Sequence, residues 1–396
     1  MAATGHALLS PSSSHRWIHC TPSARLEEGV PDTGSVYAEE GSCAHALCEC
    51  GLLRLLEAER GDGYTGARRE AEREFEAGRE RFYNAEMQEA VDMYVALVWE
   101  KYREAVKTTL DAELFVERRL DFGKYIPGSF GTADAIVIAD GLMEVVDFKY
   151  GKGVEVSATG NTQMMIYALG ALDAYSWEYD IRRVRMTIVQ PRKANVSEYE
   201  LGVDDLARWQ EEVLSPAARK ADRGEGEQQP GEWCRFCKVR ARCARLADQA
   251  TAAYLRHERK ETISDTEMPP LLALLPAIKA WAVSVEEYAL ARAVSGVEFP
   301  GWKVVEGRSV RKVADPGTLR QRLLDAGAKA EDICKPTELR PIGELEKLVG
   351  KKEFARLAEG CVEKPEGKPA LVPSSDKRAA KNYSTAQADF ESLRLD

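Results

Sequence analysis

Residues 131–167 read GTADAIVIADGLMEVVDFKYGKGVEVSATGNTQMMIY, and this stretch decides the fold. Two apolar runs, Thr132–Ala139 and Leu142–Lys149, lie on either side of Asp140-Gly141. An Asp-Gly pair between two apolar runs is a strong hairpin signal. We therefore expect two antiparallel strands, followed after a Gly/Ser-rich turn by a helix.

Each apolar run carries charge where a buried strand should carry none. Asp134 interrupts the first run, and Asp147 and Lys149 end the second. Because side chains alternate along a strand, Asp147 and Lys149 project from the same face, about 7 Å apart. In the predicted helix, Gln163 and Tyr167 are four residues apart and share one face.

Two carboxylates and one lysine on a hairpin suit metal-assisted hydrolysis of a phosphodiester. Carboxylates hold a hard divalent cation such as Mg²⁺ or Mn²⁺, which polarises the phosphate and lowers the pKa of a bound water. The lysine can orient that water or offset charge on the phosphate. The alternative is a surface hairpin in which Asp and Lys form an ordinary cross-strand pair.

The hairpin resembles the catalytic hairpin of the PD-(D/E)XK nuclease superfamily, here as Asp134, twelve residues, and then Asp147-Phe148-Lys149. Asp147 stands where many relatives carry Glu, and the motif permits either. The resemblance implies an α/β fold with a mixed central sheet flanked by helices, and a hydrolase that acts on phosphodiester bonds. It makes Asp134 and Asp147 metal ligands and Lys149 the catalytic lysine.

Two further motifs resemble the RecB-type branch of this superfamily. Gln163-x3-Tyr167 is similar to its QxxxY motif and would support the site or touch DNA. His45, in GSCAHALCE, lies in a predicted helix, as does the additional metal-ligating histidine of that branch, so the resemblance makes His45 a third ligand. Without the resemblance, a lone histidine on a mixed helical face is usually structural. Glu49, one turn beyond His45, could accept a hydrogen bond from it.

Three of the nine cysteines lie close together in GEWCRFCKVRARCARLA, after the linker-like residues 222–230. Cys234 and Cys237 form a CxxC pair, and Cys243 follows after five residues. With no export signal, metal ligation explains this spacing better than a disulfide framework. Because only three thiols are local, a fourth ligand must come from elsewhere in the chain.

The CRISPR-associated and AddB-like members of the RecB branch close a 4Fe–4S cluster with one early cysteine and a late C-x2-C-xn-C triplet. Cys20, in SSSHRWIHCTPSA, stands where the early cysteine should be. The resemblance therefore implies a cluster held by Cys20 and the triplet, which would join the N-terminal helix to the far end of the nuclease domain. Zinc is the less favoured occupant, and His19 or Cys43 would then replace Cys20. We interpret the remaining cysteines as ordinary thiols: Cys48, Cys50, Cys334 and Cys361.

Composition limits the classes of protein that fit. The chain has 396 residues, 44% of them hydrophobic and 30% charged, which favours a globular protein with two or three structural units. We expect no membrane association, because no apolar run approaches the ~20 residues of a membrane span. No signal pattern is visible, so we expect a cytoplasmic location in a bacterial host cell.

The net charge of −10 argues against a generally basic nucleic-acid coat, but local patches steer DNA and a nuclease is not excluded. Residues 234–245 form one such patch, without any acid. It could contact phosphates, or it could be a solvated helix face. Its basic residues are Arg235, Lys238, Arg240, Arg242 and Arg245.

The order of the predicted elements indicates the domain organisation. We expect helices at 35–59, 67–106 and 203–220, a helix that carries Gln163, and strands at 113–120, 132–139, 142–149 and 184–190. A nuclease domain would then span 1–248, followed by a mainly helical region, 249–360, and a basic, extended tail, 361–396. In the helical region we expect a hairpin of 302–306 with 309–313, and helices at 269–295, 316–326, 336–348 and 351–357.

The layout resembles an uncharacterised phage and prophage family within the superfamily that is often associated with recombination, over about residues 8–245. We therefore expect a metal-dependent DNA nuclease, specifically an exonuclease, that makes single strands for a phage single-strand annealing or single-strand-binding protein. Two other classes stay open. One is a non-catalytic DNA-binding or scaffold protein that retains the fold. The other is a zinc-stabilised regulator whose Asp-x-Lys hairpin is structural.

Overall fold

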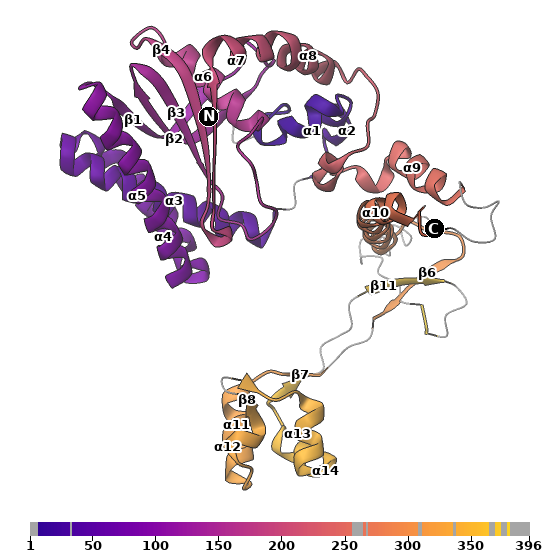
Figure 1. Cartoon of the computed structure of the whole chain (residues 1–396). Helices are drawn as coiled ribbons and strands as arrows, with labels where there is room; N and C mark the ends of the chain where they lie inside the picture. The colour runs from indigo at the N-terminus through magenta and orange to yellow at the C-terminus, as the bar shows by residue number, and fades with distance from the viewer. Residues whose placement is uncertain are drawn as a thin grey trace, which may run out of the picture. The chain divides into compact units, whose positions relative to one another are not determined.

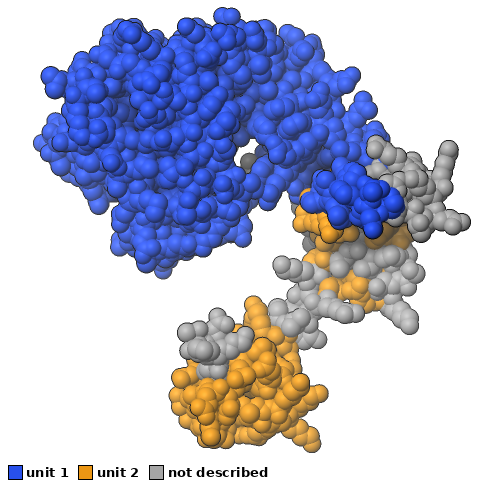
Figure 2. Space-filling model, in the orientation of Figure 1, with its two compact units in different colours: residues 1–277 blue, residues 278–396 orange. Residues whose placement is uncertain are grey.

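A computed structural model describes residues 7–31, 34–255, 264–266, 268–307, 311–335, 338–363, 369–373 and 378–380. The chain forms two compact units, residues 1–277 and 278–396 (Figure 2). The domain limits expected from the sequence, at 248 and 360, stay predictions about folding units. Each unit is described by itself below.

Unit 1 is built on a five-stranded mixed sheet (Figure 1). The strands lie side by side in chain order, and all neighbours are antiparallel except β3 and β4, which are parallel. That parallel pair requires a crossover connection, which contains α6 (Thr162–Tyr175). The strands are β1 (Glu113–Asp121), β2 (Phe130–Ala139), β3 (Gly141–Phe148), β4 (Ile181–Gln190) and β5 (Asn195–Gly202). The predicted fold class, a mixed central sheet flanked by helices, is confirmed.

Helices cover both faces of the sheet, and the alternation of side chains along β2 shows this. Ile136 and Ile138 belong to a core that includes residues of α6, whereas Ala135 and Val137 belong to a second core with residues of α3 and α5. Burial on both faces explains why these strands read as nearly continuous apolar runs. The helices on the second core are α3 (Val36–Arg60), α4 (Thr65–Phe82) and α5 (Ala85–Thr108). Those that share the first core with α6 are α1 (Ser14–His19), α2 (Ser23–Glu27), α7 (Val203–Trp209) and α8 (Ser215–Arg223).

Short helical segments complete unit 1. They are the 3₁₀ turns η1 (Pro11–Ser13), η2 (Asp62–Tyr64), η3 (Pro191–Lys193), η5 (Glu232–Phe236) and η6 (Arg240–Arg242), the π-helical turn η4 (Gln210–Leu214), and the α-helices α2 (Ser23–Glu27) and α9 (Ala244–Leu255). The helix expected at 203–220 is therefore three joined segments, with η4 between α7 and α8.

Unit 2 contains a small helical core that two strand pairs close. β6 (Trp302–Glu306) pairs with β11 (Pro369–Pro373), and β7 (Lys312–Val313) pairs with β10 (Val362–Glu363). Between β7 and β10 the chain forms α11 (Pro316–Asp325), α12 (Ala330–Ile333), β8 (Cys334–Lys335), β9 (Glu338–Leu339), α13 (Ile342–Val349) and α14 (Lys351–Leu357). The core of this segment includes Leu319, Leu323, Leu345 and Phe354.

Several expectations about the elements are wrong. The strands of the expected hairpin at 302–313 pair instead with β11 and β10, and residues 308–310 of that hairpin lie outside the described part. The single helix expected over 67–106 breaks before Asn84, whose side chain accepts a hydrogen bond from Met87 N and so caps α5. The helix expected at 336–348 begins only at Ile342, after Pro341. The edge strand β5 was not expected, because its side chains are only partly buried and its apolar pattern is weak.

The statement that no apolar segment approaches the length of a membrane span is also wrong. Within the described residues, α10 (Met268–Val294) is long and apolar enough to cross a membrane by length and composition. Lys279 is the single charged residue between 268 and 285. One helix of this kind is weak evidence, so the absence of membrane association stays a prediction.

Close packing of α6 on the sheet gives a test of the fold. A Cβ atom on Gly170 would lie 2.4 Å from Cε1 of Phe122. We therefore expect Gly170→Ala to lower the free energy of unfolding by about 1–3 kcal/mol through overpacking. Urea denaturation measures this change. Gly41→Ala in α3 is the matched control, because its Cβ would meet nothing within 4 Å. Equal stability of the two variants would contradict the packing described here.

Candidate functional site

The predicted site residues lie beside an interruption in the pairing of β1 with β2. β1 and β2 are paired on both sides of Glu117 and Asp134, but these two described residues do not pair with each other. The β2–β3 ladder ends at Ala135 and Val146, so Asp134 and Asp147 lie one residue beyond it. Glu117 adopts a left-handed backbone with φ +45°, which is uncommon for a residue other than glycine. Neither aspartate is paired in the β1–β2 or β2–β3 ladder, whereas Asp147 still pairs with Ile188 of β4.

Asp134 is held by one backbone group and one imidazole. Its Oδ2 accepts a hydrogen bond from Phe148 N at 2.7 Å, and its Oδ1 lies 3.4 Å from Nδ1 of His45 on α3. Burial acts to raise the pKa of Asp134, but His45, Lys149 and the Phe148 N–H outweigh it, so that the pKa is lowered. Asp134 is therefore a carboxylate at neutral pH.

Asp147 and Lys149 form an ion pair in which only one carboxylate oxygen makes a hydrogen bond of good geometry. Lys149 Nζ lies 3.1 Å from Oδ1 and 3.0 Å from Oδ2 of Asp147. Asp147 is 3% exposed, and its Oδ2 has no hydrogen bond of good geometry within the described structure. Burial raises the pKa of Asp147, and the negative charge of Asp134 adds to this, while Lys149 opposes it. Oδ2 thus has the Lys149 ammonium as its neighbour, and a carboxylate in this position can also bind a metal cation.

Gln163 links the ion pair to the helix α6. Its Oε1 accepts from Lys149 Nζ at 3.4 Å, and its Nε2 lies 3.4 Å from Asp147 Oδ1 and 3.3 Å from the Tyr167 hydroxyl. Tyr167 is 7% exposed and packs near Phe122. Burial raises the pKa of Tyr167, so its hydroxyl is neutral. The expected helical pair thus lies beside the expected hairpin residues in one chain of contacts.

His45 and Glu117 complete the acidic side of the site. His45 Nδ1 lies 3.7 Å from Glu117 Oε1, and the His45 ring meets the edge of Phe148. Burial acts to lower the pKa of His45, but Asp134 and Glu117 together raise it well above the ordinary value. His45, Glu117 and Asp134 each offer one ligand atom, and these atoms all lie within 4.8 Å of one another. This set could hold a metal ion.

Glu117 was missed by the sequence analysis. The signal for it was the strand ELFVERRL itself, because an antiparallel register between this strand and the hairpin places Glu117 opposite Asp134. The expected role of Glu49 is not supported, since the described structure contains no hydrogen bond between Glu49 and His45. Burial raises the pKa of Glu49 to about 7, and Glu117 and Glu74 add to this.

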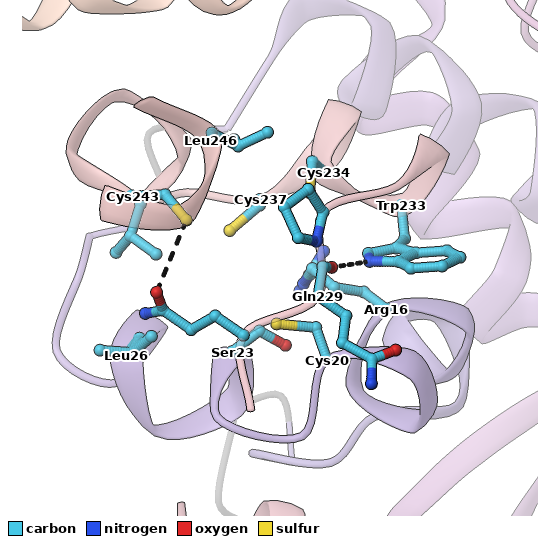
Figure 3. A pocket seen from close by; sticks show the side chains of 13 residues that line it. Arg16, Cys20, Ser23, Leu26, Gln229, Trp233, Cys234, Cys237, Cys243 and Leu246 are labelled. Carbon is cyan, nitrogen blue, oxygen red and sulfur yellow. Dashed lines mark hydrogen bonds between the residues drawn. The ribbon is translucent and has the colours of Figure 1, made fainter. Parts of the chain in front are cut away.

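The four cysteines that the resemblance singled out line one cavity in unit 1 (Figure 3). Cys20 follows α1, Cys234 lies in η5, and Cys237 and Cys243 flank the next turn. Gly231 N donates to Cys234 Sγ at 3.4 Å. Burial raises the pKa of the Cys234 thiol, and burial with the nearby Glu27 carboxylate raises that of Cys237 to about 12.

Protein contacts already join the N-terminal segment to this cysteine segment. Arg16 Nη1 donates to the carbonyl of Phe236 at 3.1 Å, and Lys238 N donates to Glu27 Oε1 at 2.7 Å. The His19 ring stacks on Trp233 with 4.3 Å between centroids. These contacts bring together residues more than 200 positions apart, as the expected ligand set required.

The two alternative fourth ligands lie elsewhere. Cys43 belongs to the core between α3 and α4, where its sulfur lies near Phe75, and His19 does not line the cavity. Cys48 and Cys50 are buried in α3, and Cys361 is buried in unit 2, as ordinary thiols would be. The side chain of Cys334 lies outside the described ones. Of the candidates for the fourth position, Cys20 is therefore the one that shares a cavity with the triplet.

Comparison with known proteins gives one family and distant structural similarities. A model of the family described as "Protein of unknown function (DUF2800)" matches residues 6–379. The solved structure of SSO0001 is 15% identical, with 59% of this chain and 96% of that chain covered and a TM-score of 0.23. A structure from Eubacterium rectale named as a "putative exonuclease" is 12% identical, with 66% and 92% covered and a TM-score of 0.31. Both similarities are distant.

The raised pKa of His45 predicts how metal binding depends on pH. A ligating imidazole must be neutral, so a bound ion has to displace the proton that Asp134 and Glu117 retain on His45. Below the raised pKa, we expect Mn²⁺ affinity to increase about tenfold per pH unit, with about one proton released per ion. Above that pKa the dependence should level off. Calorimetric titrations with Mn²⁺, in two buffers of different ionisation enthalpy, measure both quantities.

His45→Gln should bind Mn²⁺ more weakly and should release no such proton. A suitable control is Glu74→Gln, which removes a neighbouring charge on α4 outside the ligand set. If His45→Gln kept the affinity and the proton release of the wild type, His45 would not be a ligand.

Proposed function

The chain belongs to the DUF2800 family, and we propose that it is a metal-dependent DNA nuclease of the PD-(D/E)XK type, specifically an exonuclease. One observation carries the proposal. Asp134, Asp147, Lys149 and His45 come from three different elements and converge beside the unpaired position of the β1–β2 ladder. A structural Asp/Lys pair would not need Asp134 and His45 beside it.

Each residue of the site has a separate role in the proposed reaction. His45, Glu117 and Asp134, whose ligand atoms lie within 4.8 Å of one another, would hold Mg²⁺ or Mn²⁺, with Asp147 as a further ligand. The imidazole nitrogen favours Mn²⁺. When bound, such an ion supplies a Lewis acid for the phosphate and a water of lowered pKa. Lys149 Nζ is positively charged and is held between Asp147 and Gln163, so it can orient the attacking water or offset charge on the phosphate. Tyr167 fixes the amide of Gln163.

We further propose that Cys20, Cys234, Cys237 and Cys243 hold a 4Fe–4S cluster. The four cysteines line one cavity, and four thiolates are the ligand set that such a cluster takes. A single zinc ion with four sulfur ligands is the alternative occupant. The role of such a cluster would be structural, because it would add covalent links between two segments that already touch.

Substrate, partner and location follow from the same proposal. The basic residues of 234–245 lie beside the cysteine cavity and would contact DNA phosphates. An exonuclease of phage or prophage DNA would leave single strands for a single-strand annealing or single-strand-binding protein. We place this reaction in the cytoplasm of the bacterial host, without membrane association.

Cleavage assays test the nuclease directly. We expect Asp147→Asn and Lys149→Ala each to lower the cleavage rate by about 10²-fold or more, because each removes charge from the reacting centre. Digestion of end-labelled linear, circular and single-stranded DNA with Mg²⁺ or Mn²⁺ measures the rate and the need for an end. Asp173→Asn is the control, since Asp173 pairs with Lys124 on the surface of the same helix that carries Gln163.

Wild-type rates in either site variant would contradict these roles. A wild-type protein that binds DNA, binds Mn²⁺ and cleaves none of the substrates would instead be a non-catalytic DNA-binding protein with a nuclease fold.

Removal of Cys20 tests the cluster. We expect Cys20→Ser to lose the iron–sulfur absorbance near 400 nm and to melt at a lower temperature, because the cluster would close a very long loop. Protein contacts also join the two segments, so the variant should stay folded. Iron, zinc and sulfide analysis of anaerobically purified protein measures the occupant. Cys50→Ser, a buried cysteine of α3, should keep the absorbance. Four irons per chain in Cys20→Ser would place the fourth ligand elsewhere.

A further inference from the structure

Two buried hydrogen-bond donors beside the cysteine cavity have no acceptor. Ser23, at the start of α2, is 2% exposed, and its hydroxyl has no hydrogen-bond partner in the described structure. Arg16, on α1, bonds Phe236 O and Glu27 through its two terminal nitrogens, but its buried Nε is unpartnered. Both side chains line the cavity together with Cys20 and the triplet (Figure 3).

Unpartnered donors of this kind are uncommon, because burying one without an acceptor destabilises the folded state. Two oxygen acceptors in the cavity wall, one on Gln228 and one on Gln229, already have other donors. Gln228 Oε1 lies 3.9 Å from Cys243 Sγ, and Gln229 O accepts from Trp233 Nε1 at 2.7 Å. The wall also carries the four cysteine sulfurs, which can accept hydrogen bonds.

We propose that Ser23 Oγ and Arg16 Nε donate hydrogen bonds to sulfur atoms of the group that the four cysteines hold. This inference rests on the proposed iron–sulfur cluster and is independent of the nuclease activity. Thiolate and sulfide sulfurs accept hydrogen bonds, and such bonds favour the more negative, reduced state of a cluster. The two donors therefore raise the reduction potential of the cluster and slow its loss.

Arg16 is held in place for this role. The Glu27 carboxylate accepts a hydrogen bond from Arg16 Nη2 at 2.5 Å and another from Lys238 N in the cysteine segment. The guanidinium charge also opposes the negative charge that four thiolates bring. Ser23 contributes a neutral hydroxyl from a different helix, so the two contributions can be separated.

The experiment uses the full-length protein, purified anaerobically with its cluster. Ser23→Ala removes the hydroxyl, Ser23→Thr retains it, and Arg16→Lys retains the charge but removes Nε. The midpoint potential comes from a dye-mediated redox titration, followed by absorbance and by the electron paramagnetic resonance of the reduced cluster. The rate of iron release to a chelator gives an independent measure. Circular dichroism checks that each variant is folded.

Two matched controls separate the hydrogen bonds from general packing. Ser14 is 1% exposed, but its hydroxyl already bonds Thr162 at 2.6 Å, so Ser14→Ala removes a buried hydroxyl outside the cavity. Arg25 Nε already donates to Asp222 O, and Arg25 does not line the cavity, so Arg25→Lys is the control for Arg16→Lys.

We expect Ser23→Ala and Arg16→Lys each to shift the midpoint potential downward and to release iron about two- to tenfold faster, as the loss of one hydrogen bond implies. Ser23→Thr and both controls should resemble the wild type. Wild-type potentials and release rates in both test variants would overturn the inference while the cluster stands. A wild-type protein with zinc, or with no metal, would overturn the inference together with the cluster. A cluster-loaded protein that cleaves no DNA would overturn the nuclease alone.

Discussion

The break in the sheet at Asp134 is the constraint on which the rest of unit 1 depends. β2 is buried on both faces from Ala135 to Ala139, and the Asp134 carboxylate lies at the end of this part, where it needs polar partners. The Asp134 oxygens contact the Phe148 amide and the His45 imidazole there. Glu117 accommodates this with a left-handed backbone, a conformation that costs about 1–3 kcal/mol and persists only where the surroundings determine it. The flanking helices α3 and α6 supply those surroundings.

The cysteine cavity depends on contacts between two segments that are far apart in the sequence. The N-terminal segment is joined to the cysteine segment by hydrogen bonds and by one ring stack, and the four thiols line one cavity between these segments. Contacts of this kind reduce the conformational entropy that is lost when a group binds between the two segments. Two buried donors in its wall, Ser23 Oγ and Arg16 Nε, have no hydrogen-bond partner among the described residues.

How much the sequence predicts depends on whether the determining contacts are local. The hairpin with Asp134, Asp147 and Lys149 follows from an Asp-Gly turn between apolar runs, and the pairing of β2 with β3 is confirmed. Glu117 was missed because its place depends on the register of a neighbouring strand. The prediction of the partner of β6 was wrong for the same reason. Its partner β11 lies more than 60 residues later, and no local sequence pattern indicates this pairing. The break before Asn84 did carry a local signal, the N-cap, which the charge pattern of 67–106 obscured.

The strand pairs of unit 2 have a consequence for changes in chain length. Because β7 lies beside β10, and β6 beside β11, the chain enters and leaves the helical segment at neighbouring points. That segment is enclosed by the two strand pairs. The entropy cost of closing a loop rises only slowly with its length. A change of length within residues 314–361 should therefore leave the pairing of 302–306 with 369–373 nearly as stable as before.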